Sequence, residues 1–374
     1  MPEVDAKDAG RVAFFLPHLG GGGTEKAVVT LANGLAARGY AVDMILVRWV
    51  GQLTVGLSKN VRTIELKAVD SYLALPALIK YLRKERPRVL ISALDLTNLV
   101  ALIARKLSGS QTLTVIRIEN TLSAQRRTWW KKRLEKTLLS WMYPKADRII
   151  AVSKAVAVDA ARYTGIAPSR INVIYNPVLG EEQPRTEQAA HIHPWLADGC
   201  PPVILGVGRL AEQKDFSTLL RAFALVHLER DARLIILGEG EQRERLTALA
   251  DELKVREDID MPGFRENASV FMQHSKVFVL SSIYEGLPTV LIEALASGCP
   301  VVSTDCPGGA REILADGQYG ELVPPGDAEA MARAMLKIMD GVRKQVDPEW
   351  LAQFRTEHVL EQNIRMLESL SRSH

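Results

Sequence analysis

The sequence has few cysteines, little net charge and no long hydrophobic run, and each of these excludes a class of protein. Its 374 residues contain three cysteines, Cys200, Cys299 and Cys306, and no Cys-x-x-Cys pair. This pattern predicts neither a disulfide framework nor a zinc site, and it fits a reducing cytoplasm. A formal net charge of +3 is too small to indicate nucleic-acid binding. The apolar run at 12–16 is far shorter than the roughly 20 residues of a membrane span, so no crossing segment is expected.

What is present is a repeated alternation of apolar runs with stretches whose apolar residues recur every three or four positions. This alternation predicts an α/β protein with parallel sheets covered by helices. Its length favours two domains. We expect a first Rossmann-like domain at 1–180, a linker at 181–201, a second Rossmann-like domain at 202–345, and a helix at 346–374 that could cross back to the first domain. The expected strands are 12–16, 41–47, 89–93, 113–118, 148–152, 171–174, 203–207, 233–237, 259–261, 277–280, 301–304 and 321–323.

Four glycines, Gly20 to Gly23, follow the first expected strand and precede a helix that should start near Thr24. Doubly wound sheets bind ligands at such a turn, because glycines let successive N–H groups approach an anion before a helix start. The alternative is a tight turn without a ligand. The run does not match the spaced glycine pattern of dinucleotide-binding proteins.

Two cations follow the strand at 203–207: Arg209, and then Lys214 before a helix at 216–226. The carboxyl end of a strand is where open α/β sheets bind ligands, and an arginine with a lysine can neutralise a diphosphate. Alternatively, both are solvated surface charges.

The block Ser281 to Glu293 reads as a strand, a loop containing Glu285, and a helix with Pro288 in its first turn. Glu285 can accept hydrogen bonds from sugar hydroxyls. Glu293 lies one turn into the helix and leans toward its start, where it can reach a ribose. The other interpretation is two ordinary surface glutamates.

These residues resemble those of glycosyltransferase family 4, a family of GT-B fold with two Rossmann-like parallel-sheet domains facing each other across a cleft. The likeness covers nearly the whole chain: Arg209 with Lys214, EGLPTVLIEALASGCPVVSTD from Glu285, and GGGTEK from Gly21. It implies an acceptor-binding first domain and a second domain that binds a nucleotide sugar. Arg209, Lys214 and Glu285 are then the catalytic residues, with Arg209 and Lys214 on the donor diphosphate. The remaining donor-binding residues implied are Glu293 on the ribose and Gly22, Gly23, Gly286, Leu287, Pro288, Thr289 and Val290.

The resemblance also implies transfer of a hexose-type sugar with retention, without a metal or other cofactor. We favour a UDP-sugar donor over a GDP-sugar. The triplet from Asp258 to Asp260 could be a metal site, but it is better interpreted as a turn entering a strand. The sequence departs from the family after the strand at 113–118, where many members carry a histidine; the matching position in this chain is Asn120, directly after Glu119. Either the histidine is dispensable here or one of these two residues replaces it.

A basic and aromatic stretch, RRTWWKKRLEK from Arg126 to Lys136, precedes Leu138 and Trp141. As a helix it aligns Trp130, Leu134, Leu138 and Trp141 on one face between basic flanks. Such a face suits anionic lipid headgroups or a lipid diphosphate, although it could instead be a core stripe. The acceptor-side candidates are Glu119, Asn120, Arg126, Arg127, Trp129, Trp130, Lys131, Lys132 and Arg133.

The stretch at 89–104 resembles the branch of the family that extends lipid-linked oligosaccharides in bacteria. It implies a glycan on a polyprenyl diphosphate, or another cell-surface glycan precursor, as acceptor. It also implies a peripheral protein at the cytoplasmic face of the inner membrane, with no nucleic acid partner. Alternatives on the same frame are a sugar phosphorylase, a nucleotide-sugar epimerase, or a non-catalytic glycosyltransferase-like binding protein.

Overall fold

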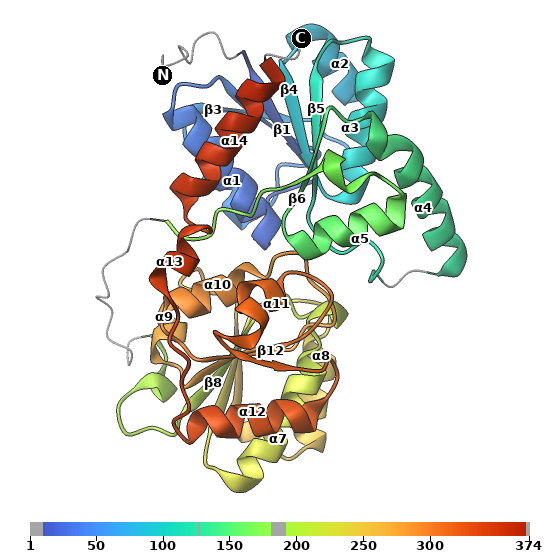
Figure 1. The fold of residues 1–374 in the computed structure, drawn as a ribbon. Helices are drawn as coiled ribbons and strands as arrows, with labels where there is room; N and C mark the ends of the chain where they lie inside the picture. Colours follow the sequence, from blue (N-terminus) through green and yellow to red (C-terminus); the bar gives the residue numbers. More distant parts are fainter. Residues whose placement is uncertain (1–9, 126–127, 181–191, 372–374) are drawn as a thin grey trace. The chain divides into compact units, whose positions relative to one another are not determined.

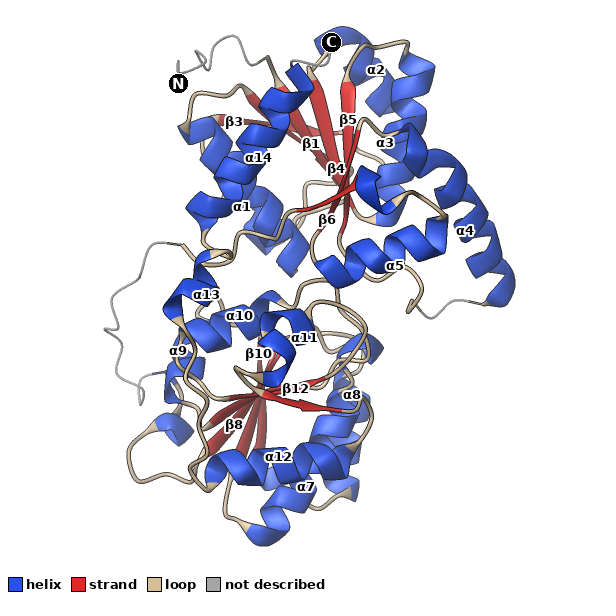
Figure 2. Ribbon diagram, viewed as in Figure 1, coloured by secondary structure: helices blue, strands red, loops and turns tan. Residues whose placement is uncertain are grey.

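The computed structural model describes residues 10–125, 128–180 and 192–371. It forms two compact units: the first consists of residues 1–180 and 353–374, and the second of residues 181–352. Each unit holds one parallel sheet covered by helices (Figures 1 and 2). The expected α/β class with two parallel sheets is therefore confirmed. Within the described residues, no helix is both long enough and apolar enough to span a membrane.

The sheet of the first unit has seven strands in the order β3-β2-β1-β4-β5-β6-β7. Every residue of its central strands is buried, because helices lie on both faces of the sheet, as parallel sheets require. The strands are β1 (Val12–Leu16), β2 (Val42–Leu46), β3 (Val61–Glu65), β4 (Val89–Ala93), β5 (Leu113–Ile118), β6 (Arg148–Ala151) and β7 (Ile171–Val173), and the helices are α1 (Gly23–Ala37), α2 (Leu75–Glu85), α3 (Asp95–Ser108), α4 (Trp129–Met142), α5 (Lys154–Thr164) and α14 (Thr356–Ser371).

The sheet of the second unit has six strands in the order β10-β9-β8-β11-β12-β13. Helices α7 and α12 pack on one face through a core that includes Phe216, Phe223 and Met335. The strands are β8 (Val203–Val207), β9 (Arg233–Leu237), β10 (Ile259–Gly263), β11 (Val277–Leu280), β12 (Val301–Thr304) and β13 (Glu321–Val323), and the helices are α7 (Phe216–Glu229), α8 (Arg243–Glu252), α9 (Ala268–His274), α10 (Thr289–Ala296), α11 (Ala310–Ile313), α12 (Ala328–Met339) and α13 (Pro348–Ala352).

Short 3₁₀ helices connect these elements in both units. They are η2 (Gln52–Thr54), η3 (Tyr143–Lys145), η4 (Pro168–Arg170), η5 (Pro194–Leu196), η6 (Glu212–Lys214), η7 (Arg256–Asp258) and η8 (Ala315–Gly317).

Three features of the fold differ from the sequence prediction. The prediction omitted β3, an edge strand with three of its five side chains exposed and hence no buried apolar run. The single helix expected at 346–374 is divided into α13 and α14, with Arg355 between them forming a bridge to Leu179. Within the expected linker, 181–191 lie outside the described residues, whereas His193 contacts Asp260 and Trp195 lies under Arg233 in the second unit.

Candidate functional site

The second unit has a natural ligand position where its strand order reverses. Strands β8 and β11 are neighbours, but the chain leaves them toward opposite edges of the sheet. Ligands of open α/β sheets bind outside the carboxyl ends of the strands at such a switch point. The loop after β8 carries Arg209 and Lys214, and the loop after β11 carries Glu285.

Hydrogen bonds join these two loops directly. The Ile283 N–H donates to the Gln213 carbonyl at 2.8 Å, and the Gln213 amide donates to the Tyr284 carbonyl at 2.9 Å. The Ser281 hydroxyl donates to the Lys214 carbonyl at 2.7 Å. Residues about seventy positions apart in the chain are thereby held side by side, and Lys214 is placed next to Glu285.

Lys214 and Glu285 form a short ion pair, with 2.5 Å between Nζ and Oε1. The Ser282 hydroxyl donates to the same carboxylate oxygen at 2.6 Å. Glu285 is only 5% exposed. Its second oxygen, Oε2, accepts no hydrogen bond from a described residue and is left as an acceptor for a ligand hydroxyl.

Close backbone packing positions Arg209. A Cβ at Gly238 would lie 2.0 Å from the Gly208 carbonyl oxygen, and one at Gly240 would lie 2.4 Å from that of Leu210. The loop after β9 can therefore support the backbone on both sides of Arg209 only because both positions are glycine. The Arg209 side chain is exposed and forms no ion pair with the residues described here.

A third loop, after β12, packs against the backbone of Glu285. It was not predicted from the sequence. The Glu285 N–H donates to the Pro307 carbonyl at 2.8 Å. Gly308 has φ +130°, and a Cβ there would lie 2.3 Å from the Glu285 carbonyl oxygen. The Pro-Gly-Gly run at 307–309 was the available signal. Beside it, burial and the Glu285 charge raise the pKa of the Cys306 thiol to about 12.

Helix α10 begins where the Glu285 loop ends. Pro288 is the N-cap residue rather than part of the first turn as expected, since its ψ of 90° is extended. No side chain caps this end, so its first N–H groups lack a side-chain acceptor. Glu293 is half-buried in the second turn. Gly286, Leu287 and Pro288 are buried, and Thr289 and Val290 are half-buried.

In the first unit, Gly22 is the N-cap of α1 and Gly23 is its first residue. Helix α1 therefore starts one residue before the expected Thr24. Gly22 has no capping side chain, and the preceding Gly21 has φ +96°. The glycines themselves place no side chain at the carboxyl end of β1, but the Gly20 N–H donates to His18 Nδ1 at 3.1 Å and the Glu25 carboxylate lies against Gly22.

Glu119 and Asn120, the two candidates to replace the family histidine, have different surroundings in the structure. Glu119 is buried and its Oε1 accepts a hydrogen bond from Arg117 Nε at 2.9 Å. Asn120 is half-buried. Its amide makes no hydrogen bond with another described residue.

Helix α4 exposes the aromatic face predicted from its spacing. Trp130 and Trp141 are 52% and 62% exposed, and Leu134 is also exposed. The alternative of a core stripe is therefore wrong, because only Leu139 and Met142 of this helix are buried. Two of the acceptor-side candidates, Arg126 and Arg127, lie outside the described residues.

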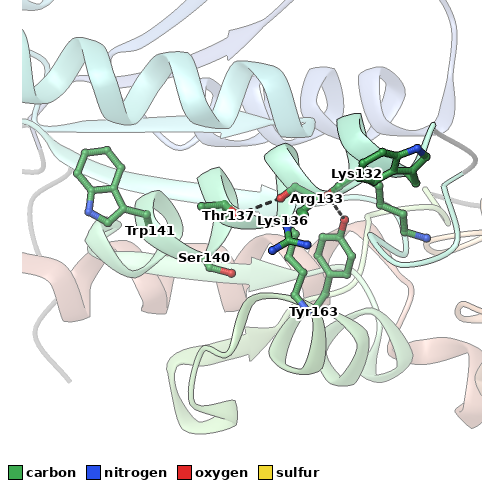
Figure 3. Close-up of a pocket in the computed structure, with 8 residues that line it drawn as sticks. Lys132, Arg133, Lys136, Thr137, Ser140, Trp141 and Tyr163 are labelled. Carbon is green, nitrogen blue, oxygen red and sulfur yellow. Dashed lines mark hydrogen bonds between the residues drawn. The ribbon is translucent and has the colours of Figure 1, made fainter.

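A basic groove of about 900 Å³ lies beside α4 (Figure 3). Tyr163 of α5 forms part of its wall, and the Tyr163 hydroxyl donates to the Lys132 carbonyl at 3.2 Å. Of the candidates, Trp129, Lys132 and Arg133 line this groove, and Lys131 lies over the Trp130 ring. The other lining residues are Lys136, Thr137, Ser140 and Trp141.

The Asp258 to Asp260 triplet is engaged in ion pairs. Asp258 ends η7 and pairs with Arg233 and with His227, whereas Asp260 lies in β10 and contacts His193 at 2.8 Å. Across the described parts of the chain, no group of three or more His, Cys, Asp or Glu side chains could hold a metal ion.

Comparison with protein families matches both halves of the chain. The family described as Glycosyltransferase Family 4 matches residues 21–179, and Glycosyl transferases group 1 matches residues 188–348. A relative from Campylobacter jejuni, N-acetylgalactosamine-N,N'-diacetylbacillosaminyl-diphospho-undecaprenol 4-alpha-N-acetylgalactosaminyltransferase, is 32% identical over 342 residues. The match covers 88% of this chain and 90% of that relative.

A second relative from the same organism and two solved structures extend the match over nearly the full length. The relative, GalNAc-alpha-(1->4)-GalNAc-alpha-(1->3)-diNAcBac-PP-undecaprenol alpha-1,4-N-acetyl-D-galactosaminyltransferase, is 25% identical and covers 96% of this chain and 98% of its own. Anabaena Alr3699/HepE in complex with UDP-glucose has a TM-score of 0.81 at 19% identity, covering 96% and 100% of the two chains. The lipopolysaccharide outer core galactosyltransferase WaaB has a TM-score of 0.71 at 22% identity, covering 96% and 99%. At these identities the two structures show the fold, which is GT-B.

Proposed function

The chain is an enzyme that belongs to glycosyltransferase family 4, and on that premise we propose that it transfers a hexose-type sugar, with retention, from a nucleotide diphosphate to a lipid-linked glycan. The observation that carries the donor part is the Lys214–Glu285 pair at the β8/β11 switch point, next to the exposed Arg209. We favour a UDP-sugar and retain a GDP-sugar as the second choice. The complex of HepE with UDP-glucose supports a nucleotide-sugar donor.

The chemistry of the site follows from where charge develops. The bond between the sugar C1 and the diphosphate breaks, a bond from C1 to an acceptor oxygen forms, and the acceptor proton passes to the departing diphosphate. Arg209, Lys214 and the first N–H groups of α10, which no side chain caps, are the donors that would stabilise the leaving diphosphate. The open oxygen of Glu285 would accept a hydrogen bond from a sugar hydroxyl, and the Glu293 carboxylate would accept hydrogen bonds from the ribose hydroxyls.

The acceptor part of the proposal rests on helix α4. Exposed tryptophans beside lysines and arginines fit a membrane interface, and the groove at Lys132, Arg133 and Lys136 fits a phosphorylated headgroup. The two Campylobacter jejuni relatives are named for glycans on undecaprenol diphosphate, which supports a lipid-linked acceptor. We place the protein at the cytoplasmic face of the inner membrane, as a peripheral protein.

The test begins with a thermal-shift screen of UDP-, GDP-, ADP- and dTDP-sugars, since a ligand that binds only the native state raises the melting temperature. The donor that stabilises the protein is then used in transfer assays. We expect Lys214→Ala and Glu285→Ala to lower transfer by about 100-fold or more, because each removes a group that acts on developing charge or orients the sugar.

The matched control is Lys337→Ala, since Lys337 forms a 3.0 Å pair with Glu321 in the same unit, away from the switch point. Its transfer rate should be that of the wild type. Wild-type transfer by both Lys214→Ala and Glu285→Ala would remove the proposed donor site. Conversion of the donor without an acceptor would instead identify an epimerase, and a requirement for inorganic phosphate a phosphorylase.

A further inference from the structure

A cluster of buried charges lies at the carboxyl end of β5 in the first unit. Arg117 is fully buried, although a strand between two layers of helices normally carries apolar side chains there. Its Nε donates to Glu119 Oε1 at 2.9 Å, and its Nη2 donates to Asn176 Oδ1 at 2.6 Å. The third nitrogen, Nη1, is buried without a partner among the described residues.

Stability is a poor explanation for this cluster. Removing two charges from water is costly, and apolar residues of similar size often stabilise a core as well or better. A buried guanidinium nitrogen without a partner adds to that cost. Groups retained against such a penalty are more often found where a protein needs a particular side chain held in one place.

The residue that Arg117 holds is Glu119, and Glu119 in turn holds the start of α1. Its second oxygen, Oε2, accepts hydrogen bonds from Asn176 Nδ2 at 3.2 Å and from the Thr24 hydroxyl at 3.3 Å. Thr24 directly follows Gly23 in the first turn of α1. Glu119 therefore links the glycine-rich loop at 20–23 to β5 and to the segment that follows β7.

The other end of the loop is held against the segment that follows β2. The Leu19 N–H donates to the Val50 carbonyl at 3.0 Å, and the Leu53 N–H donates to the Leu19 carbonyl at 3.2 Å. Gly51 has φ +121°, and a Cβ there would lie 1.9 Å from the Leu19 carbonyl oxygen. The four glycines thus lie between two anchors, one at Leu19 and one at Thr24.

We propose that Glu119 is a positioning residue that, oriented by Arg117 and Asn176, holds Thr24 and so fixes the glycine-rich loop. With three donors on its two oxygens, Glu119 does not act as a base. The inference rests on the proposed function only for its ligand, the diphosphate of the nucleotide sugar. Of the two residues at the place of the family histidine, Asn120 is then the one with an amide free for a substrate.

The test uses variants of Thr24 that distinguish the effect of losing its hydroxyl from the effect of changing the shape of its side chain. Thr24→Val removes the hydroxyl, Thr24→Ser keeps it, and Thr30→Val removes a hydroxyl that bonds only the Lys26 carbonyl on the same helix. In the full chain without ligand, we expect Thr24→Val to speed amide hydrogen exchange across 19–25 by about 5-fold or more. Its affinity for UDP, measured by calorimetry, should fall by about 3- to 10-fold, the range expected for one hydrogen bond. Thr24→Ser and Thr30→Val should match the wild type in both measurements, and all melting temperatures should stay within about 2 °C.

The possible outcomes distinguish failure of the positioning role of Glu119 from failure of the proposed donor ligand. Unchanged exchange across 19–25 in Thr24→Val overturns the positioning role. Faster exchange with unchanged UDP affinity overturns the link to the donor. If wild-type protein does not bind UDP, the proposed UDP donor fails, and hydrogen exchange alone decides the positioning role.

A second variant tests whether Glu119 is a base. Arg117→Met with Glu119→Gln removes both buried charges and keeps an oxygen that can accept from Thr24. A positioning role predicts UDP affinity within about 10-fold of the wild type and an unchanged pH dependence of donor turnover. Loss of the acidic limb of that pH profile in the double variant would show that Glu119 acts as a base.

Discussion

The buried carboxylates of this protein differ in how many hydrogen bonds they accept from other protein groups. Asp43 of β2 is fully buried and accepts hydrogen bonds from Arg11, Arg62 and Tyr81. It lies near the start of its strand, at the opposite end from the glycine-rich loop. Glu285, at the carboxyl edge of its sheet, keeps one oxygen open. A fully bonded carboxylate stabilises the fold, whereas a partly bonded one can still bind a ligand.

The fully bonded Asp43 predicts a pH dependence of stability. Burial raises its pKa, but the hydrogen bonds from Arg62, Tyr81 and Arg11 outweigh burial and hold the pKa below its usual range. Because the folded pKa lies below the unfolded one, its contribution is complete above about pH 4 and is lost as the pH falls further. We expect Asp43→Asn to lower the free energy of unfolding at pH 7 by about 3 kcal/mol and to lessen the further loss between pH 4 and pH 2.

Urea unfolding followed by circular dichroism measures both effects. Asp340→Asn, which breaks an exposed 2.7 Å pair with Arg230, is the control and should cost less than about 1 kcal/mol. Equal losses in the two variants would contradict the role given to Asp43.

At the scale of elements, α4 differs from the other helices of the first unit in how little of it is buried. Only two of its 14 residues are buried, and no side chain caps its start. Lys145 lies 3.1 Å from the centre of the Trp141 ring, and its pKa is lowered by desolvation and by the nearby Lys106. Most helical stability in proteins comes from packing of an apolar face. The apolar face of α4 has no such packing partner among the described residues of the first unit, so a membrane that binds this face could supply it.

Vesicle binding tests this surface. We expect the wild type to cosediment with vesicles of equal parts phosphatidylglycerol and phosphatidylethanolamine, and less with phosphatidylcholine alone, because basic side chains favour anionic lipid. Trp130→Ser with Trp141→Ser should weaken binding to the anionic vesicles by about 10-fold, since it removes two interfacial anchors. Leu228→Ser, at an 84% exposed leucine of α7, is the control. Equal binding by the tryptophan double variant and the control would contradict the membrane role of α4.

At the scale of the whole molecule, the chain returns to its first unit after completing the second. Phe354 packs on Tyr175 with ring centres 5.1 Å apart, and Leu360 of α14 reaches Gly34 of α1. Phe354 and Val359 are fully buried. The first unit is therefore not a single stretch of chain, because its core includes residues from 353–371 as well as from 10–180.

This arrangement predicts that damage to α14 acts on the first unit. We expect Leu360→Ala to lower the stability of the first unit by about 2–5 kcal/mol, as for other buried leucines, and to leave the second unit unchanged. Limited proteolysis with mass spectrometry can assign cleavage to one unit, and new cuts should appear in 10–180 and 353–371 but not in 192–352. Leu228→Ala, at the surface of α7, should leave the pattern as in the wild type. Cleavage confined to 192–352 would show that α14 supports the second unit instead.

The alternation of strands and helices, and most strand boundaries, could be predicted from the local sequence pattern alone. Strands such as β1 and β8 are apolar along their whole length because helices cover both faces, so a local pattern was sufficient to predict them. The same local pattern did not predict β3, whose exposed side chains leave no such run. The family resemblance was also readable locally, since the motif around Glu285 is continuous.

Which distant residues are in contact could not be predicted in this way, because these contacts depend on the order of the strands in each sheet. Lys214 and Glu285 are 71 positions apart and touch because β8 and β11 are neighbours. Glu119 and Thr24 are 95 positions apart and meet because β1 and β5 end at the same edge of their sheet. Likewise, helical spacing predicted that Trp130 and Trp141 share one face of α4, but it did not predict which face of the helix packs against the core. Strand order and layer packing are long-range properties, and residue spacing along the chain does not contain them.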